Sequence, residues 1–108
     1  MGLLGKFFGR KREPLEEGIE IVSRHPVASF HVESVLRIGE KVTIIGTVEG
    51  GMVYPGYKVK GKKNAALVYI IEKDRKRVEY AVDGDKVALI LEGRIETKKG
   101  DTLEVYQS

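Results

Sequence analysis

Residues 46–56 read GTVEGGMVYPG, in which two adjacent glycines separate an apolar, strand-like run from a second, shorter one. The first run, residues 42–49 (VTIIGTVE), alternates with a period of two and places Ile44 and Val48 on the same face. Adjacent glycines between two such runs are typical of a tight hairpin, and Pro55-Gly56 marks a further turn. The stretch therefore predicts strand, turn and strand, and the hairpin is a candidate for holding a ligand.

Short strand-like runs follow one another through the rest of the chain. Residues 86–91 (KVALIL) form a nearly continuous apolar run, which is typical of a strand buried on both faces, and we expect Ile45 and Ile90 to point outward. Glycine-containing turns separate the runs, and this spacing favours strands over helices. We therefore predict an all-β fold, a small closed β-barrel over residues 30–108. Its other strands are expected at residues 30–38, 57–60, 65–73 and 102–106.

Two segments precede the predicted barrel. Residues 1–14 form a basic, apolar tail, helical or disordered, in which four apolar residues could share one helix face (Leu3, Leu4, Phe7 and Phe8). Three glycines in the tail each cost a helix roughly 1 kcal/mol, so a docking helix, a weak membrane-surface anchor and a frayed tail all remain open. Residues 15–29 are a lead-in segment that could add an edge strand covering Ile45 and Ile90.

Composition limits the chain to one domain and a narrow range of chemistry. A length of 108 residues suits a single core, and no apolar run is long enough to span a bilayer, so we expect a cytoplasmic protein without a membrane partner. The lack of cysteine and the presence of only His25 and His31 predict no metal site and no cofactor. Many charged residues and only two side-chain amides, Asn64 and Gln107, favour a hyperthermophilic source.

Basic residues concentrate in one part of the chain. Residues 58–77 hold eight lysines and arginines against Glu72 and Asp74, although the whole chain has a net charge of only +3. Such a segment suits an anionic partner such as RNA, and a solvated surface typical of a hot organism has the same composition. The predicted phosphate contacts are Lys58, Lys60, Lys62, Lys63, Arg75, Lys76 and Arg77.

Four tyrosines lie close to the basic segment in sequence. Aromatic rings of this kind stack on unpaired bases in proteins that bind single-stranded nucleic acid. Half-buried packing against the barrel is the alternative for each ring taken alone. The four residues are Tyr54, Tyr57, Tyr69 and Tyr80.

Two patterns that could suggest an enzyme have simpler interpretations. Residues 56–62 (GYKVKGK) match the start of a phosphate-binding loop, but Lys63 replaces the hydroxyl residue that would ligate magnesium, and no helix follows. Asp83-Gly84-Asp85 resembles a carboxylate pair, but before a strand it is more often a turn whose carboxylates accept local backbone hydrogen bonds. We therefore expect no catalytic residues and no enzymatic activity.

From residue 30 onward, an ordered series of motifs resembles the β-barrel domain 2 of the translational GTPases, the family of elongation factor Tu. No nucleotide-binding domain precedes the barrel in this sequence, so the resemblance implies a stand-alone barrel, similar to small tRNA-binding proteins of hyperthermophilic archaea. The motifs are residues 30–35 (FHVESV), 42–51 (VTIIGTVEGG), 53–59 (VYPGYKV), 70–72 (IIE), 81–93 (AVDGDKVALILEG) and 98–103 (KKGDTL).

The resemblance also gives the opening hairpin a role. In this family the neighbourhood of the hairpin lines a pocket for the terminal adenosine of the tRNA CCA end. Carried over to this sequence, the resemblance implies that Val48 and Pro55 form apolar walls with Glu49 beside them. Tyr80 falls near a family position that contacts the same nucleotide, where a tyrosine could stack on the base.

These observations together predict a module that binds RNA without catalysis. The RNA that we expect it to bind is tRNA. One alternative is a protein-interaction adaptor, in which the barrel docks on a ribosome or translation factor and residues 1–14 grip a partner. Another is a contact with small-subunit ribosomal RNA, which the barrel also makes in the family.

Overall fold

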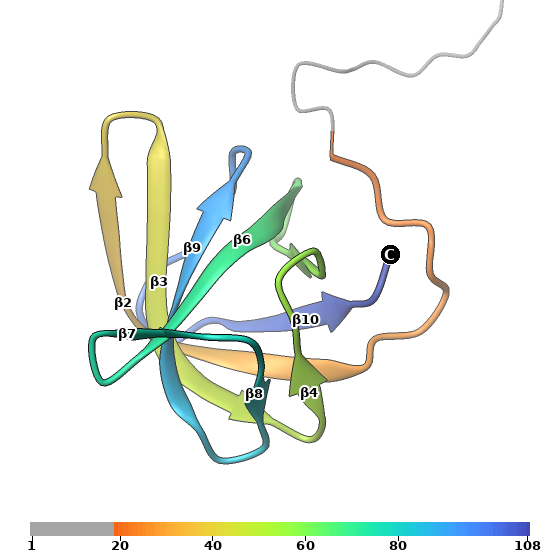
Figure 1. Cartoon of the computed structure of the whole chain (residues 1–108). Coiled ribbons are helices and arrows are strands. Elements are labelled where there is room, and N and C mark those ends of the chain that lie inside the picture. The colour runs from red at the N-terminus through yellow and green to blue at the C-terminus, as the bar shows by residue number, and fades with distance from the viewer. Residues whose placement is uncertain (1–18) are drawn as a thin grey trace, which may run out of the picture.

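The computed structural model describes residues 19–108, which form a closed barrel of six antiparallel strands (Figure 1). The predicted all-β barrel is confirmed, and this part of the chain has no helix that could span a membrane. The expected tail at residues 1–14 lies outside the described residues. In order around the barrel, the strands are β10 (Thr102–Tyr106), β2 (Ala28–Ile38), β3 (Lys41–Glu49), β9 (Lys86–Glu92), β6 (Ala65–Lys73) and β5 (Lys58–Lys60), and β5 pairs with β10 to close the ring.

The period-two pattern of the sequence gives the strands of the barrel one face toward the core and one toward the outside. In β3 and β9 every second side chain is buried, and the residues between them lie on the outside. The inward residues of all six strands meet in one core, which shields them from water and supplies the main driving force for folding. Its largest fully buried members are Phe30, Ile44, Ile71, Leu89, Leu91 and Ile95.

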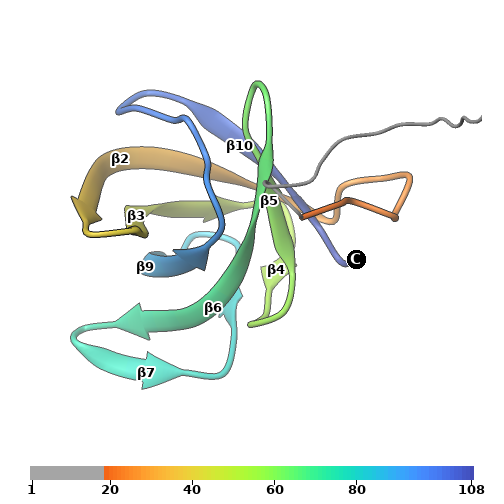
Figure 2. The ribbon, with the colours of Figure 1, turned by 90° about the horizontal axis from the view of Figure 1, so that it is seen from above.

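Three further strands are short. Strands β4 (Met52–Val53) and β8 (Ala81–Val82) pair as a separate two-stranded ribbon beside the barrel. Strand β7 (Lys76–Val78) folds back on the end of β6 as a hairpin that extends beyond the barrel (Figure 2). Asp74 and Arg75 form the turn of this hairpin, with φ angles of 55° and 67° that match a two-residue type I′ loop.

The opening stretch forms the expected hairpin, and a second turn holds it in place. A Cβ atom on Gly51 would lie 2.0 Å from the carbonyl oxygen of Val27, so the chain can pass here only with glycine. The Gly50 amide donates to Asp83 Oδ1 at 2.7 Å, and the Asp83 amide donates to the Gly51 carbonyl at 2.9 Å. The Asp83-Gly84-Asp85 segment is a structural turn, as predicted, and the structure shows that it also clamps the glycine hairpin.

Residues 19–27 contain no strand, although the sequence suggested an edge strand over Ile45 and Ile90. Three backbone donors of this segment bond near the C-terminus instead. Val22 and Ser23 donate to the carbonyl of Ser108 at 2.9 and 2.7 Å, and Val27 donates to Val105 at 2.7 Å. Residues 22–27 therefore run beside the C-terminus (Figure 1), while β2 begins at Ala28.

Candidate nucleic-acid interface

The β4–β8 ribbon presents a pair of tyrosines to solvent. Val53 and Ala81 face each other across the ribbon and are both fully buried, which anchors it to the core. The next residues of the same register, Tyr54 and Tyr80, point the other way because side chains alternate along a strand. Their rings stack with centroids 5.7 Å apart and planes at 30°, and Tyr80 remains 51% exposed.

A tight turn brings a third ring to this pair. Pro55 and Gly56, with a φ of 98° at the glycine, occupy the central positions of a type II turn that the Tyr57 amide closes onto the Tyr54 carbonyl at 3.0 Å. The rings of Tyr54 and Tyr57 lie 5.5 Å apart, and Tyr57 also packs against the core. We call Tyr54, Tyr57 and Tyr80 the tyrosine platform. An apolar surface of this kind is suited to stacking on a planar ring.

The predicted basic residues divide into two groups at opposite ends of β6. The β5 arm consists of Lys58, Lys60 and Lys62, and the β7 arm consists of Arg75, Lys76 and Arg77. The β5 arm joins the first residues of β6 and the β7 arm joins the last, about 26 Å away for a nine-residue strand.

The tyrosine platform lies between the two arms. Tyr57 accepts a backbone hydrogen bond from Val68 in the middle of β6 at 2.8 Å, directly beyond the pairing of β5. On the other side, β7 leaves β6 at the pairing of Val78 with Ile71 and leads to Tyr80 two residues later. Figure 2 shows β5 and β7 at opposite ends of β6. The order along this edge of β6 is therefore basic, aromatic, basic.

The cations of the β5 arm face acceptors within the chain. Lys58 and Lys60 both point away from the core, since Val59 between them is buried. Lys58 Nζ donates to the Glu20 carbonyl at 2.5 Å, and Lys60 lies opposite Glu104 of β10. A hollow of about 470 Å³ joins Lys60 and Lys62 to Asp101 and Glu104. These carboxylates offset part of the positive charge of the β5 arm.

Asp101 shows this charge balance directly. The backbone N–H of Lys98 donates to Asp101 Oδ2 at 3.1 Å and is the largest cause of a lowered pKa at Asp101. The positive charge of Lys62 lowers this pKa further. Lys63 turns away from this group and lines a separate hollow of about 980 Å³ with Asn64 and Arg94.

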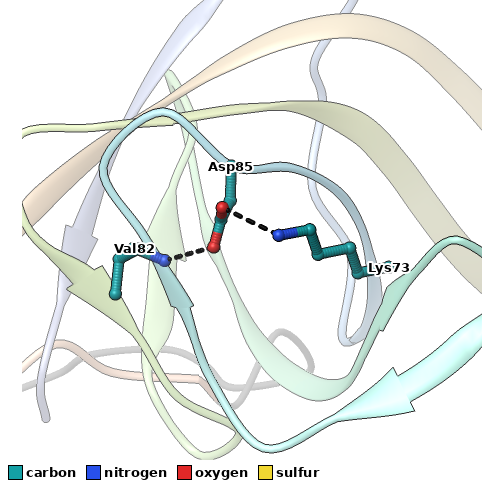
Figure 3. A network of polar contacts seen from close by, with 3 residues as sticks. All are labelled: Lys73, Val82 and Asp85. Carbon is teal, nitrogen blue, oxygen red and sulfur yellow. Dashed lines mark hydrogen bonds and ion pairs between the residues drawn. The ribbon is translucent and has the colours of Figure 1, made fainter.

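The β7 arm projects into solvent and is fixed at its base. Lys73, the last residue of β6, donates to Asp85 Oδ1 at 3.0 Å, and the Val82 amide of β8 donates to Asp85 Oδ2 at 2.9 Å (Figure 3). The hydrogen bond from Val82 and then the one from Lys73 lower the pKa of Asp85. One carboxylate therefore ties the base of the β7 arm to the ribbon that carries the platform.

The structure separates several residues that the sequence grouped. Val48 is fully buried, so its side chain belongs to the core and cannot form an exposed pocket wall. Glu49 is exposed but borders a hollow of about 360 Å³ with residues 26–29, on the side of β2. Pro55 is exposed in the turn of the platform. It directly follows Tyr54, whose ring stacks on Tyr80. Tyr69 lies elsewhere, with Lys41 Nζ 5.2 Å from its ring centroid.

Metal binding finds no support in the described part of the chain. Between residues 19 and 108, no group of three histidine, cysteine or acidic side chains is arranged to hold a metal ion. Asp83 and Asp85 instead accept hydrogen bonds from the backbone and from Lys73.

Comparison with known proteins relates this barrel to translation factors. The structure is similar to GDP-bound aIF5B from Aeropyrum pernix, with a TM-score of 0.67 and 24% identity over 79% of this chain. It is also similar to a bacterial selenocysteine-specific elongation factor, EF-Sec, with a TM-score of 0.62 and 25% identity over 86% of this chain. The chain spans only 15% and 16% of these two proteins, respectively.

The sequence itself matches a family model. No curated protein sequence matches the chain. The model of elongation factor Tu domain 4, however, matches residues 25–104, well over half of the 108 residues. This match and the two structures confirm the resemblance to the β-barrel of the translational GTPases. The chain belongs to the elongation factor Tu domain 4 family.

Proposed function

We propose that this barrel binds RNA, specifically tRNA, and that it does so without catalysing a reaction. The tyrosine platform would stack on an unpaired base at the 3′ end or in a loop, and the two basic arms would contact the flanking phosphates. Pro55 and Tyr80 thus retain the contact with the nucleotide that the family resemblance implies. Val48 does not, because its buried side chain supports the hairpin from within the core.

The observation that carries the proposal is the order of groups along β6. Proteins that bind single strands combine a positive track for the backbone with aromatic rings for the bases. Here a half-exposed stack of rings lies between two cationic groups that are about 26 Å apart along β6, and the ribbon beneath the rings is anchored by buried residues. Stacking on Tyr80 would cover an exposed aromatic surface and needs no rearrangement of the backbone.

Membership of a translation-factor family favours tRNA over other RNAs. The two similar structures are an archaeal and a bacterial translation factor. A ribosomal partner is the second candidate, for the same reason, and it would use the barrel as a docking module.

Fluorescence anisotropy with labelled tRNA, intact and lacking its CCA end, tests the proposal across a series of salt concentrations. End recognition predicts binding that weakens when the CCA end is removed. Binding that depends steeply on salt but not on the CCA end would replace end recognition with phosphate contacts alone. A complete lack of binding would contradict RNA binding and favour the ribosomal or protein partner.

A further inference from the structure

An apolar patch lies on the outer face of strands β2, β3, β9 and β6. The outward orientation predicted for Ile45 and Ile90 is confirmed, since both alternate with buried neighbours. The strand register places Leu36, Thr43, Ile90 and Ile70 in one row across the four strands, with Ile45 in the row beside it. Leu36 and Tyr69 at the two sides are each 50% exposed. We call Leu36, Ile45, Tyr69, Ile70 and Ile90 the outer patch.

The size of the outer patch limits what can cover it. Four strands span about 14 Å, and the patch is only a few residues long in the other direction. A stable dimer buries about 800 Å² on each partner, which is more than this patch offers. An α-helix with its side chains is about 10–12 Å wide, so one short helix matches the patch.

The position of the lead-in segment points to a source for that helix. Ile19 packs against Gly93, with its Cγ1 atom 3.1 Å from where a Cβ atom on that glycine would lie. Gly93 directly follows β9 and is three residues, or about 10 Å, from Ile90. The ten residues that separate Phe8 from Ile19 reach about 33 Å when extended, so residues 1–8 can reach the patch.

Two carboxylates beside the outer patch also favour this source, while the cation Lys41 lies over Tyr69 at one side of the patch. Glu92 lies in the row next to Ile90, and Glu72 lies opposite Ala88 on the same outer face. Residues 1–14 carry four basic residues against one acidic residue, and their apolar residues Leu3, Leu4, Phe7 and Phe8 have the spacing of one helix face. The basic residues would lie beside these two carboxylates when the apolar residues cover the patch.

We propose that residues 3–8 of this chain dock on the outer patch as a short intramolecular helix. The helix covers the isoleucines of β3, β6 and β9 and is stabilised by burial, which offsets the cost of Gly5. This contact is independent of the proposed RNA interface, because the platform and both arms lie along the other edge of β6.

Paramagnetic relaxation measured by NMR tests this contact in the full-length chain. The chain has no cysteine, so Lys6→Cys provides a single attachment site for a nitroxide spin label. Docking predicts loss of amide signal around Ile45, Ile70 and Ile90, with the signals of the platform preserved. Uniform signal loss over the surface, loss centred on the platform, or no loss would overturn the proposal.

Two controls separate docking from other causes of signal loss. In the first control, a chain that carries the nitroxide but no ¹⁵N is mixed with a chain that carries ¹⁵N but no nitroxide. The ¹⁵N chain should lose no signal. Loss in this mixture would overturn the proposal, because it would mean that a second copy supplies the tail. Changing Phe7 and Phe8 to serine should restore the signals, whereas the charge variant Lys11→Ala should not restore them. Unchanged signal loss in the serine variant would overturn the apolar contact.

A change in the patch itself gives a second, independent test. The Ile45→Thr and Ile90→Thr double variant keeps β-branched residues at two outward positions, so the barrel should still fold. It should also restore the signals of the spin-labelled chain. Persistent loss at Ile70 in a folded variant would place the tail elsewhere and overturn the proposal, and an unfolded variant leaves the serine variant as the deciding result.

Discussion

The two arms on either side of the tyrosine platform carry the same charge, three cations each, but have different surroundings. The β5 arm faces a backbone carbonyl and two carboxylates, and its strand is enclosed between β6 and β10. The β7 arm extends beyond the barrel and is held at its base by Lys73 and Asp85. Equal charge in the sequence therefore does not mean equal availability to a ligand. We expect the platform to contribute most to RNA affinity, then the β7 arm, then the β5 arm.

Removing the platform should have the largest effect. The Tyr54→Ala and Tyr80→Ala double variant loses the stack and should lose about 1–3 kcal/mol of binding free energy per stacked base, or about 5- to 150-fold in affinity. Because the charges are unchanged, the dependence of affinity on salt should stay the same. Anisotropy with labelled tRNA measures both quantities.

Tyr69→Ala is the matched control for this loss. Tyr69 is about as exposed as Tyr80 but lies on the outer face of the barrel, beside Lys41. Equal losses in the two tyrosine variants would mean that the platform has no special role.

Charge removal should separate the two arms. The Arg75→Ala and Lys76→Ala double variant should reduce the salt slope of binding by about 1.4, because each neutralised phosphate of a single strand contributes about 0.7. The Lys60→Ala and Lys62→Ala double variant should change both affinity and slope less, since Asp101 and Glu104 already offset those cations. A larger loss for the lysine pair would reverse the expected order of the arms.

The barrel could be predicted from the sequence because its strands follow local rules. Alternation in residues 42–49 and the apolar run at 86–91 correspond closely to β3 and β9, and glycine-rich turns separate the strands. Strand β7 could not be predicted in this way, because its residues Lys76, Arg77 and Val78 have little apolar character. Their strand conformation depends on pairing with β6.

Only part of the candidate site could be predicted from local sequence patterns. Tyr54 and Tyr80 are 26 positions apart, and they meet only because β4 pairs with β8, which no local pattern indicates. The role of Lys73 was missed for the same reason, since its partner Asp85 belongs to another turn. Val48 shows the opposite case: the alternation already placed it on the face of Ile44, and that face is the core.

The turn of the β7 arm should reveal a conflict between stability and binding. Arg75 has a φ of 67°, a conformation that costs a residue other than glycine roughly 1–2 kcal/mol. Arg75→Gly should therefore raise the stability of the barrel by about 1 kcal/mol, and with it the melting temperature, while RNA affinity falls because one cation is lost. Thermal unfolding and anisotropy test the two effects, and Lys76→Gly, outside the turn, should not raise the melting temperature.

The smallest expected effect concerns the ion pair that fixes this arm. Hydrogen bonds from Val82 and Lys73 lower the pKa of Asp85, so its carboxylate stabilises the fold above the unfolded pKa of about 3.9. That stabilisation is lost as the pH falls through the lower pKa of the folded state. Asp85→Ala should therefore reduce stability at neutral pH, and the difference from the parent chain should shrink below about pH 4.

Chemical denaturation at several pH values measures this difference. Other carboxylates with a lowered pKa, such as Glu33 and Asp101, titrate in both chains and cancel in the comparison. Asp85→Asn keeps an acceptor for the Val82 amide and should recover part of the stability. A difference that does not change with pH would mean that the charge of Asp85 has no role.

Mapping the RNA contact by NMR tests the central claim most directly. The measurement is a titration of the ¹⁵N-labelled full-length chain with a short, unpaired RNA that ends in CCA. Binding at the platform predicts shifts at residues 53–58 and 80–82, with smaller shifts at residues 74–77, and none at Ile45 or Ile90 on the outer face. Shifts confined to the outer face, or no shifts at a saturating concentration of RNA, would contradict the assignment of this edge of β6 as the RNA interface.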